Sequence, residues 1–482
     1  MKNIFSKFLV AFISVGMLVS CSKEFLDEPQ PTQGVPAGVV FSSREGVEAF
    51  ISGIMRNFRG QFVNTSGTTS TDAAGLNSIF TARSVKGNDI INTTSWYAFD
   101  YANDNREPTY RRTTFTWNYC FYMINQANGL IEGVEASTLG DSDKTELAAY
   151  GYALRGFFYH QLVLEFAPTY SFDPNYPAPP IYTATGIEGK PMSTVKEVYA
   201  LIESDLTKAV SGLTDSRLGK SYINKSVANA ILAEVYQVMG KWPEAEVAAN
   251  AAYGGNPAAV LSASTYRSGF NDYSNVEWIW GNAQSADQTN YYYGFPAAGA
   301  DHTVSSYASI YINSEFVKLF SATDVRSYFF PKSASYPLTD YRYWTTRKFK
   351  FSFDGDFAII RTPEMILLEA EAKARQAGKE TAAHDLLYTL QKNRDVNAVK
   401  SANTGAALIE EILLERRKEL YCENGIEWFD AKRLRKGITR TGNHRIGVAG
   451  NLTADDKKFF LKIPQAEIDA NPFIEPTVND NR

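Results

Sequence analysis

Cysteine and histidine are scarce in this chain. Its 482 residues include 3 cysteines and 4 histidines. The histidines are His160, His302, His384 and His444. They stand far apart, and none combines with a cysteine at the spacing of a metal site. We therefore expect no metal centre and no resident cofactor, and three cysteines are too few for a disulfide framework.

Two of the cysteines, Cys120 and Cys422, fall within apolar helical patterns. Because a free thiol behaves as a small apolar group, we interpret both as buried thiols. A disulfide between them is the alternative, since separation along the sequence says nothing about distance in space.

Signatures of catalysis and of nucleic-acid binding are also missing. The formal net charge is -5, and loss of the first 20 residues with Lys2 and Lys7 would make it more negative. This charge argues against nucleic acid as a partner. The sequence has no nucleophile-elbow, zinc-protease, P-loop or dinucleotide-binding motif, so we expect no enzyme activity. A surface glycoside hydrolase remains the alternative, because the separation of two catalytic carboxylates is a distance in space.

The apolar run at the start of the chain, Phe8–Val19, is too short to anchor the protein as a helix. A helix needs about 20 apolar residues to cross a bilayer. The run follows a basic start and ends at Leu18-Val19-Ser20-Cys21, which is typical of a lipoprotein signal. We expect cleavage of residues 1–20, acylation of Cys21 and a lipidated tether over residues 21–41. The alternative is an ordinary signal peptide followed by a chance cysteine.

Helical periodicity dominates the remainder, which we interpret as a single domain over residues 42–482. Apolar residues recur every three or four positions in residues 115–132 and 144–166. Ser42–Glu45 and Thr194–Glu197 match the capping box that opens a helix. The sequence therefore predicts a mainly α protein.

One segment has the spacing of a tetratricopeptide repeat, a pair of helices that small residues allow to pack closely. The residues at these positions are Leu232, Ala233, Tyr236, Gly240, Ala245, Ala252 and Pro257. A looser copy begins at Thr362 and continues to Leu390. We expect a helical-repeat scaffold, mainly over residues 115–255 and 362–395.

Residues 59–114 and 255–360 interrupt the helical pattern. Both segments are rich in Gly, Ser, Thr, Asn and aromatic residues, and they are too long for simple connections. Their aromatic content argues against disorder. We therefore expect the ligand-binding surface in these two loop-rich inserts.

Aromatic residues in the inserts are the candidate ligand contacts. Sugar rings pack their C–H faces on aromatic planes, and their hydroxyls need amide, carboxylate or guanidinium partners. The candidates in the first insert are Trp96, Tyr97, Arg83, Asn88 and Asp89. Those in the second insert are Tyr292, Tyr293 and Trp344. The alternative is that these rings attach the loops to the scaffold.

Charged residues cluster near the end of the chain. Glu415, Arg416, Arg417, Glu419 and Glu423 recur at helical spacings, which predicts ion pairs across a helical turn. We interpret this cluster as structural.

The chain resembles the SusD/RagB family of surface lipoproteins from Cys21 to its end. The segments that carry the resemblance are Cys21 to Pro29 (CSKEFLDEP), Ala153 to Leu164 (ALRGFFYHQLVL), Ser193 to Ala209 (STVKEVYALIESDLTKA), Ala228 to Ala245, Asp324 to Arg326, Ile360 to Ala372 (IRTPEMILLEAEA), Ile412 to Leu434 (ILLERRKELYCENGIEWFDAKRL) and Leu461 to Pro472 (LKIPQAEIDANP). The acidic residues after Cys21 also resemble the export signal of Bacteroidetes surface lipoproteins.

The resemblance implies four tetratricopeptide-like units that support a loop-rich ligand-binding half. It also implies a lipid-anchored protein on the outer face of the outer membrane, which delivers an oligosaccharide or polysaccharide to a SusC-like TonB-dependent transporter. No ligand residue transfers by motif, because the family's glycan-binding loops do not share a sequence. A peptide or another nutrient is therefore the alternative ligand.

Overall fold

The computed structural model describes residues 36–58, 73, 75–93, 95–104, 107–285, 309–352 and 354–482. The long and short α-helices are α2 (Ala37–Val40), α3 (Arg44–Arg56), α4 (Gly75–Ser84), α5 (Ala98–Tyr101), α6 (Arg111–Ala136), α7 (Asp141–Phe166), α8 (Val195–Gly212), α9 (Lys225–Met239), α10 (Trp242–Tyr253), α11 (Pro257–Val260), α12 (Ser314–Val317), α13 (Thr362–Ala374), α14 (Glu380–Arg394), α15 (Gly405–Leu420), α16 (Ile426–Arg433) and α17 (Gln465–Ala470). The strands are β1 (Ile90–Asn92), β2 (Pro177–Ala178), β3 (Ser193–Thr194), β4 (Trp278–Asn282), β5 (Ile310–Ile312), β6 (Phe329–Pro331), β7 (Trp344–Thr346) and β8 (Phe357–Arg361).

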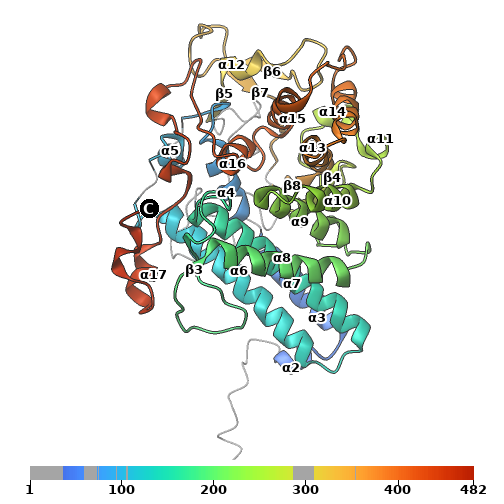
Figure 1. The fold of residues 1–482 in the computed structure, drawn as a ribbon, viewed down its shortest axis with the longest axis vertical. Helices are drawn as coiled ribbons and strands as arrows, with labels where there is room; N and C mark the ends of the chain where they lie inside the picture. The colour runs from blue at the N-terminus through green and yellow to red at the C-terminus, as the bar shows by residue number, and fades with distance from the viewer. Residues whose placement is uncertain are drawn as a thin grey trace, which may run out of the picture.

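The helices form a stack in which neighbours along the chain pack side by side. Helices α6 to α10 follow one another in this way, α13 packs on α10, and α14 and α15 pack on α13 (Figure 1). This is the mainly α, tetratricopeptide-like helical-repeat scaffold that the sequence predicts.

Local sequence signals fix the ends of these helices. Thr194 and Glu197 form the predicted capping box of α8. Gly240 ends α9 with a φ of 72°, a left-handed conformation that glycine adopts without steric cost, and Pro243 lies in the first turn of α10. The helix α3 differs in detail, because Ser43 rather than Ser42 caps it and accepts a hydrogen bond from the backbone N–H of Gly46.

The helical stack supports a second half that contains a small sheet. Strands β1, β5, β7 and β6 form an antiparallel sheet in that order, with Ile90 opposite Ile312 and Phe329 opposite Thr346. Figure 1 shows β5, β6, β7 and α12 at the upper end of the molecule, away from α2 and α3. The pair β4 and β8 lies between the two halves and leads directly into α13.

The inserts contain more regular structure than their composition indicates. Helix α4 is buried on every side, so it has no polar face and no helical periodicity of hydrophobicity. Trp278 and Trp280 of β4 are both buried, and in a regular strand they would lie on the same face. A register irregularity separates them, and Trp278 joins the core of the sheet half while Trp280 joins the core of the helices.

A buried ion network connects the two halves. Glu419 accepts hydrogen bonds from Arg361, Arg394 and Arg326, at 3.0, 2.9 and 3.2 Å respectively. Arg394 also donates to Glu277 just before β4. The sequence predicted ion pairs within one helix, but the guanidinium partners of Glu419 come from other segments.

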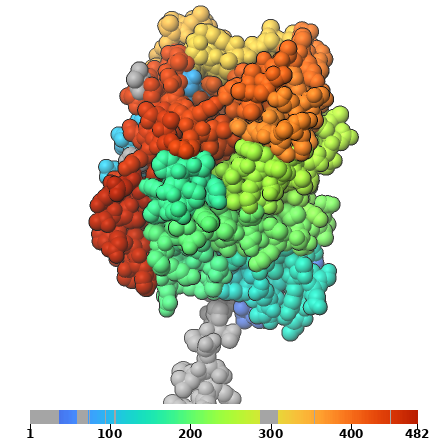
Figure 2. Space-filling model, in the orientation of Figure 1, coloured from blue at the N-terminus to red at the C-terminus, as the bar shows by residue number. Residues whose placement is uncertain are grey.

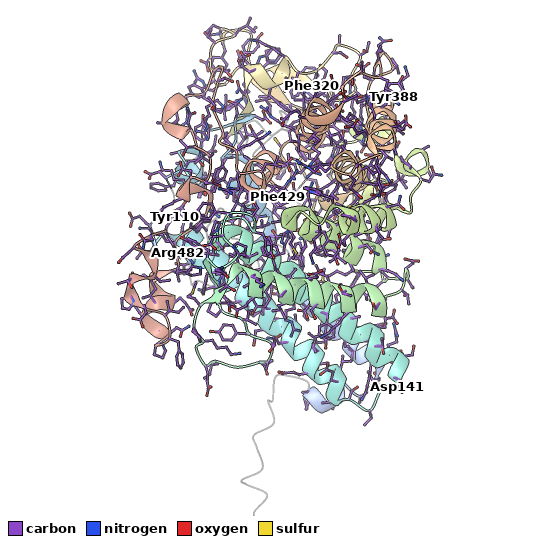
Figure 3. All side chains as sticks on the ribbon, in the orientation of Figure 1. Tyr110, Asp141, Phe320, Tyr388, Phe429 and Arg482 are labelled. Carbon is purple, nitrogen blue, oxygen red and sulfur yellow. The ribbon has the colours of Figure 1, made fainter. Side chains whose placement is uncertain are left out.

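The C-terminal segment packs along one side of the helical stack, as the red surface in Figure 2 shows. Arg482, labelled in Figure 3, donates a hydrogen bond to the backbone carbonyl of Phe166. Cys120 and Cys422 are both buried and free, which confirms their interpretation as thiols. Among the described residues, no helix has the length and hydrophobicity needed to span a membrane.

Candidate functional site

The first residue of β7, Trp344, is brought next to α12 by the sheet. It is paired with Ile312 of β5 on one side and with Pro331 of β6 on the other. Helix α12 begins at Ser314, two residues after Ile312. Trp344 therefore lies near the first turn of α12, and it lines the same cavity as Ser314 and Glu315. The ring is half-buried, and Tyr343 packs against it edge to face with ring centroids 4.8 Å apart.

A cavity of about 580 Å³ opens beside Trp344. Its lining residues are Ser314, Glu315, Val317, Lys318, Leu338, Thr339, Trp344, Gly442 and Asn443. We call this cavity the Trp344 groove. Its aromatic and aliphatic surface can cover the C–H face of a sugar ring, and its polar groups can meet hydroxyls.

The charged side chains at the groove are paired with each other. Lys318 contacts Glu315 at 2.6 Å, and Arg342 contacts Asp340 at 2.9 Å just beyond the lining. The hydrogen bond from Arg342 keeps the pKa of the Asp340 carboxyl below its usual range. The groove is therefore neutral overall, which suits an uncharged ligand.

Further aromatic residues extend the surface from the groove along the loop before β7. The Arg342 guanidinium lies over the rings of Tyr336 and Tyr341, at 4.4 and 5.1 Å from their centroids. Both rings are half-buried, so each keeps part of its surface in solvent. Asn443 donates a hydrogen bond to the backbone carbonyl of Asp340 and holds this loop against the groove.

Aromatic packing supports helix α12 on the side that faces the protein core. Phe316 is fully buried and lies 5.1 Å from Phe320 and 5.2 Å from Tyr421 between ring centroids. Phe320 is labelled near α12 and α15 in Figure 3. This packing fixes the wall of the groove that carries Ser314, Glu315 and Lys318.

Asn88, a predicted ligand contact, lies behind the groove and is buried. Its side-chain oxygen accepts hydrogen bonds from the backbone N–H of Thr441 at 2.8 Å and from the Asn313 amide at 3.1 Å. Asn313 caps α12, and Thr441 precedes the groove residues Gly442 and Asn443. Asn88 therefore positions two walls of the groove, and its side chain is not available to a ligand.

Gly442 and Asn443 are groove residues that the sequence did not single out. Gly442 has a φ of 76°, and a Cβ at this position would lie 2.2 Å from the side-chain oxygen of Asn313. Asn443 accepts a hydrogen bond from the backbone N–H of Ser314 at 2.9 Å. The Thr-Gly-Asn triplet is a turn signal in the sequence, but nothing there puts it beside Trp344.

Asp89 and Arg83, which the sequence predicts as ligand contacts, are buried structural residues instead. Asp89 is buried in an ion pair with Arg417, and burial together with nearby Glu427 raises the pKa of Asp89 to about 7 although Arg417 opposes this shift. Arg83 is buried and donates to Glu165 at 2.5 Å. Charged groups in the core need such partners, so their polar atoms are already committed.

The remaining candidates differ in their placement. Tyr97 is fully buried in the core of the sheet half, so it is corrected to a core residue. Trp96 is half-buried against the same core but does not line the Trp344 groove. Cys21, Tyr292 and Tyr293 lie outside the described residues. Of the predicted ligand contacts that are described, only Trp344 lines this cavity.

Side chains of the types that bind metal ions do not cluster in the described part of the chain. No three His, Cys, Asp or Glu residues within those ranges come together in a way that could hold a metal ion. The buried carboxylates described above are instead paired with arginine side chains.

Comparison with protein families gives two matches along the chain. A family model described as starch-binding and associating with the outer membrane matches residues 24–237. The model of the SusD family matches residues 338–479. No curated protein matches this sequence.

Solved structures share the fold over most of the chain. A SusD-like carbohydrate-binding protein from Bacteroides vulgatus ATCC 8482 is 25% identical, with a TM-score of 0.79 over 90% of this chain and 98% of its own. A SusD superfamily protein from Bacteroides thetaiotaomicron VPI-5482 is 22% identical, with a TM-score of 0.77 over 90% and 99%. A laminarin-binding SusD-like protein is 18% identical, with a TM-score of 0.66 over 90% and 98%. With both family models and this shared fold, the chain belongs to the SusD family.

Proposed function

We propose that this protein binds a neutral oligosaccharide or polysaccharide at the Trp344 groove. The observation that carries the proposal is a half-exposed indole beside a cavity of about 580 Å³ whose charges are paired. The hydroxyls of Ser314 and Thr339 line the groove and are polar groups that a sugar stacked on Trp344 could reach. The carbohydrate-binding SusD-like neighbours support the same ligand class.

We further propose that the bound glycan is delivered to a SusC-like TonB-dependent transporter in the outer membrane. The lipoprotein signal at Cys21 supports attachment to the membrane by lipid. Attachment to the same membrane raises the effective concentration of the two partners. The match to a family described as associating with the outer membrane supports this location.

The carboxylates at the groove support binding without hydrolysis. A glycosidase needs one carboxylic acid that is protonated near neutral pH, so its pKa must be raised. Asp340 has a lowered pKa instead, because Arg342 donates to it. Glu315 is paired with Lys318. We therefore propose that the groove holds its ligand and releases it unchanged.

Calorimetric titration against panels of glycans and peptides tests the ligand class. We expect at least one neutral glycan to bind, and Trp344→Ala to weaken that binding by about tenfold or more, equivalent to about 1.4 kcal/mol. Trp242→Ala is the matched control, because Trp242 is another half-buried tryptophan but belongs to the helical stack. Thermal unfolding of both variants checks that they are folded.

Two results would contradict the proposal. Binding of peptides with no binding of glycans would assign the protein to the alternative ligand class. Sustained release of new reducing ends from a bound polysaccharide would show hydrolysis.

A further inference from the structure

A second cavity, of about 620 Å³, lies on the helical half of the molecule. One wall is helix α6, another is the loop of residues 182–189 between β2 and β3, and the third is the C-terminal helix α17. Figure 1 shows this loop beside α6, at the opposite end of the molecule from α12 and β7. We call this space the α6 cavity.

The loop that forms the cavity is held by specific hydrogen bonds. Asn128 of α6 donates to the backbone carbonyls of Tyr182 and Ala184, at 3.2 and 3.0 Å. Glu132 accepts from both the backbone N–H and the hydroxyl of Thr185. Asn471 donates to the backbone carbonyl of Lys190. The cavity is therefore formed before any ligand binds, which lowers the cost of ordering it.

One stripe of α6 provides an aromatic wall and a polar group. Trp117, Phe121 and Asn125 are four residues apart and lie on the same face of the helix. The Trp117 indole donates to Glu467 of α17 at 3.1 Å, and Phe121 packs edge to face on Tyr182 at 5.5 Å. Trp117 is almost fully buried and supports Phe121 at 4.8 Å between ring centroids. Phe121 is half-buried and presents apolar surface to the cavity.

Polar groups with unused hydrogen-bonding capacity also line this cavity. Within the described residues, the side chain of Asn125 is exposed and makes no hydrogen bond. The four backbone N–H groups of residues 186–189 also donate to no acceptor in those parts of the chain. A carboxamide both donates and accepts, as a sugar hydroxyl does, and the N–H groups add donors at the opposite wall.

The charges of the cavity argue against an anionic ligand. No lysine or arginine lines it in the described structure. Both carboxylate oxygens of Glu467 already accept hydrogen bonds, from Trp117 and from Asn471. Glu188 also lines the cavity and is exposed. An anionic ligand would find no cation here and would meet this carboxylate, whereas a sugar hydroxyl could donate a hydrogen bond to it.

We propose that the α6 cavity is a second carbohydrate-binding site, which holds a neutral sugar between the aromatic stripe of α6 and the backbone N–H groups of residues 186–189. Its volume falls within the range of about 300–1,000 Å³ that is common for small-molecule sites. The site is separate from the Trp344 groove and shares no lining residue with it.

Saturation-transfer NMR tests this second site on the full mature chain. The probes are maltohexaose, laminarihexaose, cellohexaose, mannohexaose and xylohexaose. In the Trp344→Ala background, we expect at least one hexasaccharide to retain its saturation signal. Adding Tyr122→Ala and Asn125→Ala, both exposed and both at the α6 cavity, should reduce that signal about fivefold or more.

Tyr273→Ala is the matched control for Tyr122→Ala, because both tyrosines are 37% exposed and Tyr273 lines neither cavity. It should leave the signal unchanged. Loss of all signals in Trp344→Ala alone would overturn the second site and support the groove. Signals that survive the changes at Tyr122 and Asn125 would also overturn it. Signals lost with these two changes alone, but kept in Trp344→Ala, would support the α6 cavity and contradict the groove.

Discussion

At the scale of single residues, the groove depends on side chains that no ligand would touch. Asn88 and Asn313 join the start of α12 to the turn at Thr441, so the shape of the groove is set from behind. Gly442 is the tightest point of this arrangement, because its backbone is left-handed and the Asn313 side chain lies against it.

We expect Gly442→Ala to impair both stability and glycan binding. The alanine Cβ would displace Asn313, and Asn313 caps α12. Gly378→Ala is the control, because Gly378 has a nearly identical φ of 77° but open space around it. Both changes should lower the free energy of unfolding by about 1–2 kcal/mol through the backbone conformation. Only Gly442→Ala should weaken glycan binding in calorimetry, and equal affinities in the two variants would contradict the role of Asn313.

A second residue-scale prediction concerns pH and Glu165. Burial alone would raise the pKa of Glu165, but the guanidiniums of Arg83 and Arg112 lower it to about 2 from its ordinary 4.5. A carboxyl with a lowered pKa stabilises the fold above its unfolded-state pKa, and this contribution disappears as pH falls from about 4.5 to about 2. The shift corresponds to about 3 kcal/mol.

Urea unfolding at several pH values between 6 and 2.5 measures this contribution. The free energy of unfolding of the wild type should fall more steeply with decreasing pH than that of Glu165→Gln, which has no carboxyl to titrate. Parallel curves for the two proteins would show that Glu165 does not have a lowered pKa in the folded state.

The same residues show where sequence reasoning reached its limit. Polar and aromatic types between Arg83 and Trp96 match the chemistry of a sugar site, but the pattern cannot distinguish side chains that face solvent from those that face the core. Arg83 and Asp89 acquire ion-pair partners, Glu165 and Arg417, that are distant in the sequence. Trp344 lines the groove because the pairing of β7 with β5 and β6 places it there, and the sequence does not reveal this pairing.

At the scale of elements, helices marked by repeat spacing and turn residues could be predicted, and buried elements without such signals could not. The pairs α9–α10 and α13–α14 have small residues at the repeat spacing, and a glycine with positive φ, Gly240 or Gly378, follows the first helix of each pair. These signals predict α13 although it is buried along nearly its whole length. Helix α4 and strand β4 lie between the two halves and have no solvent-facing side, so their sequences lack a period that predicts them.

The contact between the two halves leads to a prediction about helix α15. Glu419 is the shared acceptor of Arg326, Arg361 and Arg394 and is fully buried. Replacing it with glutamine leaves three buried guanidiniums with too little negative charge. We expect Glu419→Gln to lower the free energy of unfolding by about 3–5 kcal/mol in urea titrations.

Glu410→Gln provides the control on the same helix. Glu410 is exposed and pairs with Lys436 in solvent, so its replacement should cost less than about 1 kcal/mol. Similar losses for Glu410→Gln and Glu419→Gln would mean that the buried network does not hold the two halves together.

At the scale of the whole molecule, the proposed function requires the protein to remain at the outer membrane with its partner. We propose that acylated Cys21 provides this attachment, because the apolar run before it is too short to serve as a membrane-spanning helix. Two acyl chains or more provide stable anchoring, whereas a single chain gives only marginal binding. A single substitution at Cys21 should therefore remove the membrane attachment and leave the glycan-binding groove unchanged.

We expect Cys21→Ala to move the protein from the membrane fraction to the soluble fraction while leaving glycan binding in calorimetry unchanged. Mass spectrometry of the wild-type N-terminal peptide should find cleavage before Cys21 and an acyl mass on it. Affinity purification of the wild type from detergent-solubilised outer membranes should recover a TonB-dependent transporter, and Cys21→Ala should recover less of it because the local concentration has fallen. An unmodified Cys21 in a protein that still fractionates with membranes would overturn the lipid anchor. A wild type that binds glycan but recovers no transporter would overturn the delivery step and leave the binding proposal intact.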